Sequence, residues 1–564
     1  METLDWLVIG AFFLALIGII IWVVKQKQND SADYFLGGRD ATWIAIGASI
    51  FASNIGSEHL IGLAGAGASS GMAMAHWEIQ GWMILLLGWV FVPFYSRSMV
   101  YTMPEFLERR YNPQSRTILS VISLISYVLT KVAVTVYAGG LVFQQVFGIK
   151  ELWGIDFFWI AAIGLVVLTA LYTIFGGMKS VLYTSVLQTP ILLLGSLIIL
   201  VLGFQELGGW NEMMKICGAV TVNEYGNTMT ELIRSNNDPN FPWLGALIGS
   251  AIIGFWYWCT DQFIVQRVLS GKNEKEARRG TIFGAYLKLL PVFLFLIPGM
   301  IAFALHQKYI GAGGEGFLPL LANGNPNADA AFPTLVAKLL PAGVKGLVVC
   351  GILAALMSSL ASLFNSSAML FTIDFYKRFK PETPEKKLVA IGQMATVVIV
   401  ILGILWIPIM RSVGDVLYTY LQDVQSVLAP GIAAAFLLGI CWKRTSAQGG
   451  MWGLISGMII GLTRLGAKVY YSNVTEVSDN LFKYVFYDLN WLFFCGWMFL
   501  FCTIVVIVVS LMTEAPDAAK IQGLVFGTST SEQKAVTRES WNHWDVIHSL
   551  IILGITGAFY WYFW

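Results

Sequence analysis

The sequence predicts an all-α, polytopic membrane protein with about fourteen transmembrane helices. Hydrophobic residues make up 57% of the 564-residue chain and charged residues only 12%, which is about half the charged fraction of an average soluble protein. Fourteen apolar runs approach or exceed the length of about 17 residues that a helix needs to cross a bilayer. These runs cover residues 5–25, 41–67, 73–96, 118–146, 154–174, 180–204, 243–266, 281–306, 344–374, 387–410, 415–440, 447–464, 489–512 and 544–563.

The order of these spans indicates two blocks of five helices, each opening on a span with polar residues or glycine near its middle. Interrupted helices at matching positions are typical of inverted-repeat transporters whose site lies at the membrane midplane. With both termini outside, about two thirds of the 35 Lys and Arg residues fall on the cytoplasmic side, as the positive-inside rule requires. The expected parts are 1–40 (first span and cytoplasmic loop), 41–204 (first repeat), 205–242 (extracellular loop), 243–440 (second repeat) and 441–564 (three further spans with a cytoplasmic loop).

Residues 47–82 carry the strongest functional signal. Polar and small residues interrupt the second span, and the charged or titratable side chains of Glu58, His59 and Glu78 follow within about twenty residues. Ionisable groups at membrane depth are costly and normally face a partner or a water-filled cavity. Small residues in GLAGAGASSG also suit close helix packing, but packing does not account for the two carboxylates and the imidazole. We therefore interpret this stretch as a binding site.

Further candidates lie in the second block. The segment GFWYWCTDQFIVQR places Tyr257 and Trp258 inside a span, where they could line a cavity or simply pack in an aromatic belt. Lys288 lies in an otherwise apolar run, several residues farther inside than a snorkelling lysine would be. Tyr418 and Gln422 are one helical turn apart and share a face.

The ninth span contains two neighbouring hydroxyls, Ser358 and Ser359, about one turn after Ala355. Two hydroxyls and a backbone carbonyl could converge there on a hard cation, and neutral oxygens suit a monovalent ion better than calcium. Serines that bond back to the carbonyls of their own helix are the alternative explanation.

Several long segments together resemble the sodium-glucose cotransporters of the solute:sodium symporter family, along nearly the whole chain. They are FASNIGSEHLIGLAG, LGWVFVPFYSRSMVYTMPEFLERRY, WYWCTDQFIVQRVLS, LKLLPVFLFLIPGMI and LMSSLASLFNSSAMLFTIDFY. The resemblance implies a LeuT-type core of five plus five inverted helices and transport by alternating access.

The resemblance also implies a sugar site and a sodium site. The implied sugar-binding residues are Asn54, His59, Glu78, Tyr257, Trp258, Lys288, Tyr418 and Gln422. The implied sodium ligands are the backbone oxygens of Ala52, Ile55 and Ala355 and the hydroxyls of Ser358 and Ser359. Ser185 stands where the family commonly has an aspartate associated with a second sodium, so we expect one sodium per sugar.

These observations predict a symporter that couples inward sodium movement to uptake of a hexose, glucose or galactose. The alternatives are a myo-inositol or other polyol symporter, a sodium-dependent sugar sensor that does not accumulate substrate, and an amino acid or carboxylate transporter, against which Glu58 and Glu78 count. No nucleotide loop, metal-ligand cluster or catalytic triad suggests an enzyme, and the net charge of +1 suggests no nucleic-acid partner. The expected partners are sodium, a small sugar and the lipid bilayer. Short loops favour a bacterial inner membrane, and the oligomeric state is left open.

Overall fold

Every predicted span coincides with helical structure, so the all-α, multi-pass fold class is confirmed. The computed structural model describes residues 1–26, 30–56, 58–321, 324–411, 417–472, 474 and 480–564, with side chains throughout except at 129, 130, 145, 409–411, 417–421, 423 and 472. Within these ranges, 11 helices are long and apolar enough to cross a membrane, and Trp43–Asn54 and Ala133–Gln144 are shorter apolar helices. The number of long apolar helices is lower than the fourteen predicted spans because some spans are divided into shorter helices and the spans 154–174 and 180–204 form one helix.

The described part of the first 218 residues contains twelve α-helices in chain order. They are α1 (Thr3–Val24), α2 (Ser31–Leu36), α3 (Trp43–Asn54), α4 (Ala64–Ser70), α5 (Ala75–Glu78), α6 (Gly81–Leu86), α7 (Val92–Ser98), α8 (Met103–Arg110), α9 (Pro113–Ser126), α10 (Ala133–Phe147), α11 (Phe157–Leu207) and α12 (Trp210–Gly218). A two-stranded antiparallel hairpin, β1 (Glu151–Leu152) and β2 (Ile155–Asp156), precedes α11.

The second half continues in the same way. Its helices are α13 (Trp243–Gly254), α14 (Gln262–Leu269), α15 (Glu274–Lys288), α16 (Ile297–Gly311), α17 (Ala331–Leu339), α18 (Val344–Met369), α19 (Lys377–Phe379), α20 (Glu385–Arg411), α21 (Leu417–Cys441), α22 (Ala447–Ser472), α23 (Leu481–Lys483), α24 (Trp491–Met512), α25 (Ser531–Glu539) and α26 (His543–Tyr562). The short helix α17 lies in the segment between α16 and α18, outside the predicted spans.

Short 3-10 and π-helical segments join or interrupt these helices. The 3-10 segments are η1 (Gly37–Arg39), η3 (Gly71–Met74) and η8 (Ala328–Ala330). The π-helical segments are η2 (Glu58–Leu63), η4 (Leu87–Phe91), η5 (Tyr127–Val132), η6 (Phe255–Thr260), η7 (Val292–Leu296), η9 (Leu370–Tyr376) and η10 (Tyr484–Asp488).

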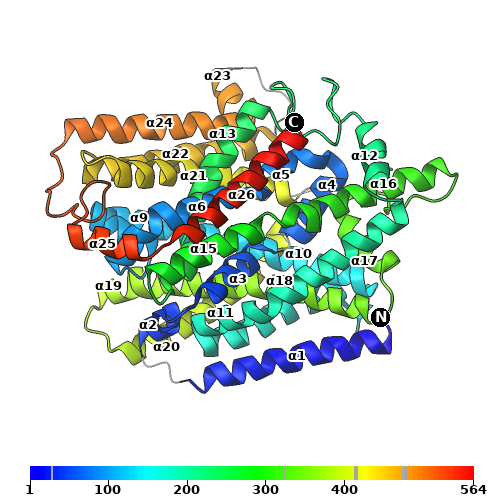
Figure 1. Ribbon diagram of the computed structural model, residues 1–564, viewed down its shortest axis with the longest axis horizontal. Helices are drawn as coiled ribbons and strands as arrows, with labels where there is room; N and C mark the ends of the chain where they lie inside the picture. The colour runs from blue at the N-terminus through cyan, green and yellow to red at the C-terminus, as the bar shows by residue number, and fades with distance from the viewer. Residues whose placement is uncertain (27–29, 57, 322–323, 412–416, 473, 475–479) are drawn as a thin grey trace.

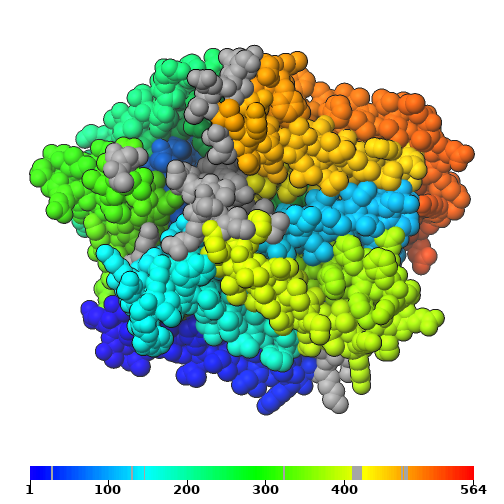
Figure 2. Space-filling model, turned by 180° about the vertical axis from the view of Figure 1, so that it is seen from behind, coloured from blue at the N-terminus to red at the C-terminus, as the bar shows by residue number. Residues whose placement is uncertain are grey.

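The bundle places α18 at its centre and α1 along one edge (Figure 1). In α18, 89% of the apolar stretch is buried by protein, against 22% in α1. The outer helices leave large apolar side chains exposed, such as Leu14 on α1 and Leu405 on α20, as expected for surfaces that face lipid. On the face shown in Figure 2, α10 and α20 lie side by side although about 250 residues separate them in sequence.

Two helices break at matching places in the two blocks. The helix α3 ends at Asn54, and Ile55 adopts an extended conformation (φ −79°, ψ 109°) before η2 begins. In the second block, α13 and η6 end at Thr260, and Asp261 is extended (φ −76°, ψ 127°) before α14. A helix that stops inside the membrane leaves the carbonyls of its last turn without helical partners. Both breaks therefore present backbone oxygens where the sequence predicts a site.

The fifth and sixth predicted spans form a single 51-residue helix, α11, interrupted at Gly177. This residue has φ 52° and ψ −147°, a conformation that glycine adopts far more readily than other residues. A Cβ atom at this position would also collide with the backbone oxygen of Tyr34. Both facts explain why glycine stands between these two spans.

Candidate functional site

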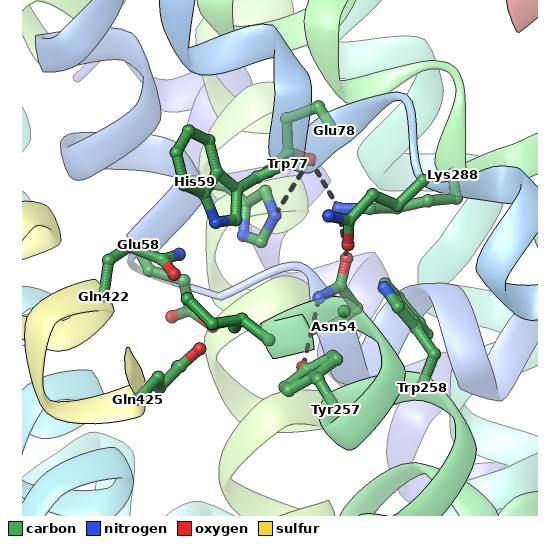
Figure 3. A pocket seen from close by; sticks show the side chains of 13 residues that line it. Asn54, Glu58, His59, Trp77, Glu78, Tyr257, Trp258, Lys288, Gln422 and Gln425 are labelled. Carbon is green, nitrogen blue, oxygen red and sulfur yellow. Dashed lines mark hydrogen bonds and ion pairs between the residues drawn. The ribbon is translucent and has the colours of Figure 1, made fainter. Parts of the chain in front are cut away.

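Seven of the eight predicted sugar-binding residues line one cavity (Figure 3). They are Asn54, His59, Glu78, Tyr257, Trp258, Lys288 and Gln422. The eighth, Tyr418, lies outside the residues whose side chains the structure describes. The cavity volume is about 50 Å³, and one water needs about 10–15 Å³ on this measure. The cavity therefore holds a few waters in this conformation and must widen to admit a sugar.

A buried ion pair forms one wall of the cavity. Lys288 Nζ donates to Glu78 Oε2 at 2.6 Å and to Asn54 Oδ1 at 3.2 Å, while His59 Nε2 lies 3.4 Å from the same Glu78 oxygen. The side chains of Lys288 and Glu78 are only 4% and 2% exposed. Lys288 is the last residue of α15, where the carbonyl end of the helix favours a cation. The wall thus combines ammonium, carboxylate, amide and imidazole groups without an unpaired charge.

Aromatic faces and amide groups line the rest of the cavity. Asn54 Nδ2 donates to Tyr257 Oη at 3.1 Å, and Lys288 Nζ lies 5.3 Å from the centre of a Trp258 ring. Gln422 Oε1 is buried and has no hydrogen-bond partner within the described part of the chain. A buried acceptor of this kind is normally satisfied by a ligand or water. The side-chain oxygen of Gln422 can therefore accept a hydrogen bond from a hydroxyl group of a ligand.

The cavity also contains four polar or aromatic residues that are not among the eight predicted sugar-binding residues. They are Glu58, Trp77, Gln80 and Gln425. Gln425 could have been found, because it stands three residues after Gln422 on one helix and must share its face. Gln80 had no such signal, because it lies in the turn between α5 and α6 and donates to the Ser250 backbone oxygen at 2.8 Å.

The predicted sodium ligands lie where three helices meet. Ala52 and Ile55 are at the break after α3, and the other three are on α18; all five residues are at most 1% exposed. Ser53 Oγ and Ser362 Oγ are 2.6 Å apart and hold α3 against α18. Ser185 on α11 completes the arrangement, because its Oγ lies 3.2 Å from Ser358 Oγ. The break after α3 and the serines of α18 therefore belong to helices that pack against each other, and backbone and hydroxyl oxygens are the ligands that a monovalent cation would use.

The model of the sodium:solute symporter family matches residues 34–457. The chain belongs to the sodium:solute symporter family. The sodium/myo-inositol cotransporter 2 of Homo sapiens is 37% identical over 94% of this chain and 79% of its own length. The sodium/myo-inositol cotransporter of Canis lupus familiaris is 35% identical over 96% of this chain and 77% of its own.

A solved structure confirms the symporter fold. A Na+-coupled sialic acid symporter in a substrate-bound outward-open state matches 92% of this chain and 99% of its own, with a TM-score of 0.73 and 22% sequence identity. Membership of the family makes this protein a transporter rather than an enzyme, with sodium as the coupling ion and a small solute as its cargo. The broad prediction of a solute:sodium symporter is confirmed, whereas the relatives named above are myo-inositol cotransporters rather than glucose cotransporters.

Proposed function

We propose that this symporter couples inward sodium movement to uptake of a cyclic polyol, with myo-inositol as the first candidate substrate. The observation that carries the proposal is one cavity that contains both the Lys288–Glu78 pair and the side-chain oxygen of Gln422, which has no hydrogen-bond partner among the described residues. Each hydroxyl of a polyol is both donor and acceptor, so a ring of hydroxyls can satisfy amide, ammonium and carboxylate groups at once. The names of the 35–37% identical relatives support the same substrate.

A hexose, glucose or galactose, is the second candidate. The flat ring of Trp258 suits the C–H face of either a pyranose or a cyclitol, and the site residues match the sugar positions implied by the resemblance. The two substrates differ at two places. A hexopyranose has a ring oxygen, which only accepts hydrogen bonds, where inositol has a carbon whose hydroxyl also donates, and it carries an exocyclic hydroxymethyl group in place of one ring hydroxyl.

Competition in sodium-driven uptake separates the two candidates. Proteoliposomes with an inward sodium gradient are given radiolabelled myo-inositol together with excess unlabelled myo-inositol, glucose or galactose. We expect myo-inositol to compete best. Preferential competition by glucose or galactose would reassign the substrate to a hexose, and binding without accumulation would indicate a sensor.

Coupling follows from the position of the proposed sodium ligands, which are the backbone oxygens of Ala52, Ile55 and Ala355 and the hydroxyls of Ser358 and Ser359. An ion shared by the broken α3 and by α18 favours one arrangement of these helices, and substrate binding is linked to that arrangement. One charge crossing about 100 mV supplies about 2.3 kcal/mol, and a tenfold sodium gradient adds about 1.4 kcal/mol. One sodium per solute, the stoichiometry we propose because position 185 is serine, therefore supports accumulation of roughly several hundredfold.

We also propose that residues 41–204 and 243–440 are the two inverted repeats, with both chain termini outside the cell membrane of a bacterial host. The matching breaks after Asn54 and Thr260 support this division, and the distribution of Lys and Arg supports the orientation. Labelling of single cysteines placed at the two termini with an impermeant maleimide tests the orientation. Labelling only after permeabilisation would contradict it.

A further inference from the structure

A second, smaller cavity adjoins the substrate cavity. Its volume is about 20 Å³, which is room for about one water molecule. The two cavities share Glu58, Tyr257 and Gln425 in their walls. The remaining wall includes Ser359, one of the proposed sodium ligands, and Lys131. A water-sized space therefore lies between the substrate cavity and the proposed sodium site.

The carboxylate of Glu58 lies near both segments that carry the proposed sodium ligands, the break after α3 and the helix α18. A Cβ atom added at Gly56 would be 2.5 Å from Glu58 Oε2, so the carboxylate folds back over the residue that follows Ile55. On its other side, Glu58 faces the cavity that Ser359 lines. In Figure 3 the Glu58 side chain lies between Gln422 and Gln425, away from the Lys288–Glu78 pair. Glu58 is thus about one water molecule from an α18 ligand and adjacent to the α3 break.

Among the charged residues that line the two cavities, Glu58 has no ion pair within the described part of the chain. No other residue in the described part of the chain forms a hydrogen bond or ion pair with its carboxylate. The cations in the two cavity walls are already paired, because Lys131 Nζ lies 2.6 Å from Asp261 Oδ2 and Lys288 Nζ lies 2.6 Å from Glu78 Oε2.

Two further charged or titratable groups, Arg267 and Tyr127, lie near Asp261 rather than in the wall that Glu58 forms. The buried guanidinium of Arg267 lines neither cavity and donates to Phe263 O and Ser366 Oγ. Tyr127 donates to the other oxygen of Asp261. The walls of the two cavities thus contain two carboxylates and two ammonium groups, and Glu58 is the one of these four that no ion pair engages within the described residues.

We propose that Glu58 is the counter-charge of the coupling sodium, acting across the water-sized cavity rather than by touching the substrate. The inference rests on the proposed sodium site, whose five ligands are all neutral oxygens. A cation transferred from water into a dry protein interior is expensive unless an opposite charge is near. An unpaired carboxylate in the same place is expensive for the same reason. Sodium and Glu58 neutralise each other, which makes Glu58 a positioning residue for the ion.

Sodium titrations of purified protein test this role. Sodium binding is followed by tryptophan fluorescence without substrate, and myo-inositol binding is measured at saturating sodium. We expect Glu58→Gln to raise the half-saturating sodium concentration by roughly tenfold, because the ion loses the attraction of one nearby opposite charge. Substrate affinity at saturating sodium should change by less than about twofold. Glu58→Asp, which keeps the charge, should stay closer to wild type and shows that the effect is electrostatic.

Gln422→Ala is the matched comparison, because it should weaken substrate binding and leave the sodium titration unchanged. If Glu58→Gln instead weakens substrate binding at saturating sodium with an unchanged sodium titration, Glu58 is a substrate ligand and the inference is wrong. Equal titrations for Glu58→Gln and wild type also overturn it. These outcomes are distinct from failure of the proposed function, in which wild-type protein itself would show no sodium-dependent binding. Should Glu58→Gln fail to fold, an Asp variant that binds sodium no better than an Ala variant overturns the inference.

Discussion

Neutralising one member of the buried Lys288–Glu78 pair should destabilise the protein strongly. The two side chains are 4% and 2% exposed and their charged atoms are 2.6 Å apart. Glu78→Gln preserves the shape of the side chain but leaves the Lys288 ammonium with only neutral acceptors, such as Asn54 Oδ1 at 3.2 Å, within the described residues. Removing one partner of a buried pair costs about 3–5 kcal/mol. We therefore expect Glu78→Gln to lower the unfolding temperature in detergent by several degrees.

The double variant Glu78→Gln/Lys288→Met separates stability from binding. It removes both charges at similar volume, which is often neutral or stabilising for a buried pair. Its unfolding temperature should therefore return to that of wild type, giving a coupling free energy of roughly 2 kcal/mol or more in a double-mutant cycle. Binding of radiolabelled myo-inositol should remain lost, because two groups of the cavity wall are gone.

Intrinsic fluorescence measures the unfolding temperature of each variant. Equilibrium binding at saturating sodium measures its affinity for myo-inositol. An unfolding temperature of Glu78→Gln equal to that of wild type would show that the pair contributes nothing to the fold. Normal substrate binding by the double variant would show that neither residue contacts the substrate. Either result would refute the reasoning.

Three further changes have definite expected outcomes. Tyr257→Phe removes the hydroxyl that accepts from Asn54 and should raise the substrate Kd about two- to tenfold, measured by equilibrium binding against wild type. Gly177→Ala places a side chain at φ 52° and should sharply lower the yield of monodisperse protein, whereas Gly164→Ala, with nothing within 4 Å of its Cβ on the same helix, should not. Burial raises the pKa of Asp329, in the loop between α16 and α17, from 3.8 to about 6. The folded state therefore binds this proton more tightly than the unfolded state does. As a result, the free energy of unfolding falls as pH rises from about 4 to 6. At pH 7.5, Asp329→Asn should be more stable than wild type by about 1–3 kcal/mol, and equal stability of the two proteins would contradict the assignment.

The sequence predicted the break in the second span because polar residues inside an apolar run are conspicuous. The helix α3 ends at Asn54, within the polar segment itself. The same reasoning located Glu78 and Lys288 separately, but their contact across 210 residues is a property of packing that no local pattern encodes. Resemblance to a family, rather than periodicity, brought these residues into one predicted site.

The second cavity shows more clearly where sequence reasoning stops. Lys131 lies in an apolar run, and its partner Asp261 is 130 residues away, so neither drew a prediction. Glu58 was noticed for its cost at membrane depth, yet its position over Gly56 depends on the end of α3 at Asn54 and the extended backbone of Ile55. An electrostatic role of this kind depends on which charged side chains line the same cavity, and the sequence alone does not show that.

Sodium-driven accumulation is the measurement that tests the central claim most directly. Proteoliposomes containing wild-type protein, Gln422→Ala or Ser359→Ala are loaded with potassium and diluted into sodium or potassium buffer with radiolabelled myo-inositol. Internal solute should rise well above the external concentration only for wild type in sodium, with the first variant impaired in substrate affinity and the second in sodium dependence. Accumulation that is equal in sodium and potassium buffers would contradict the account.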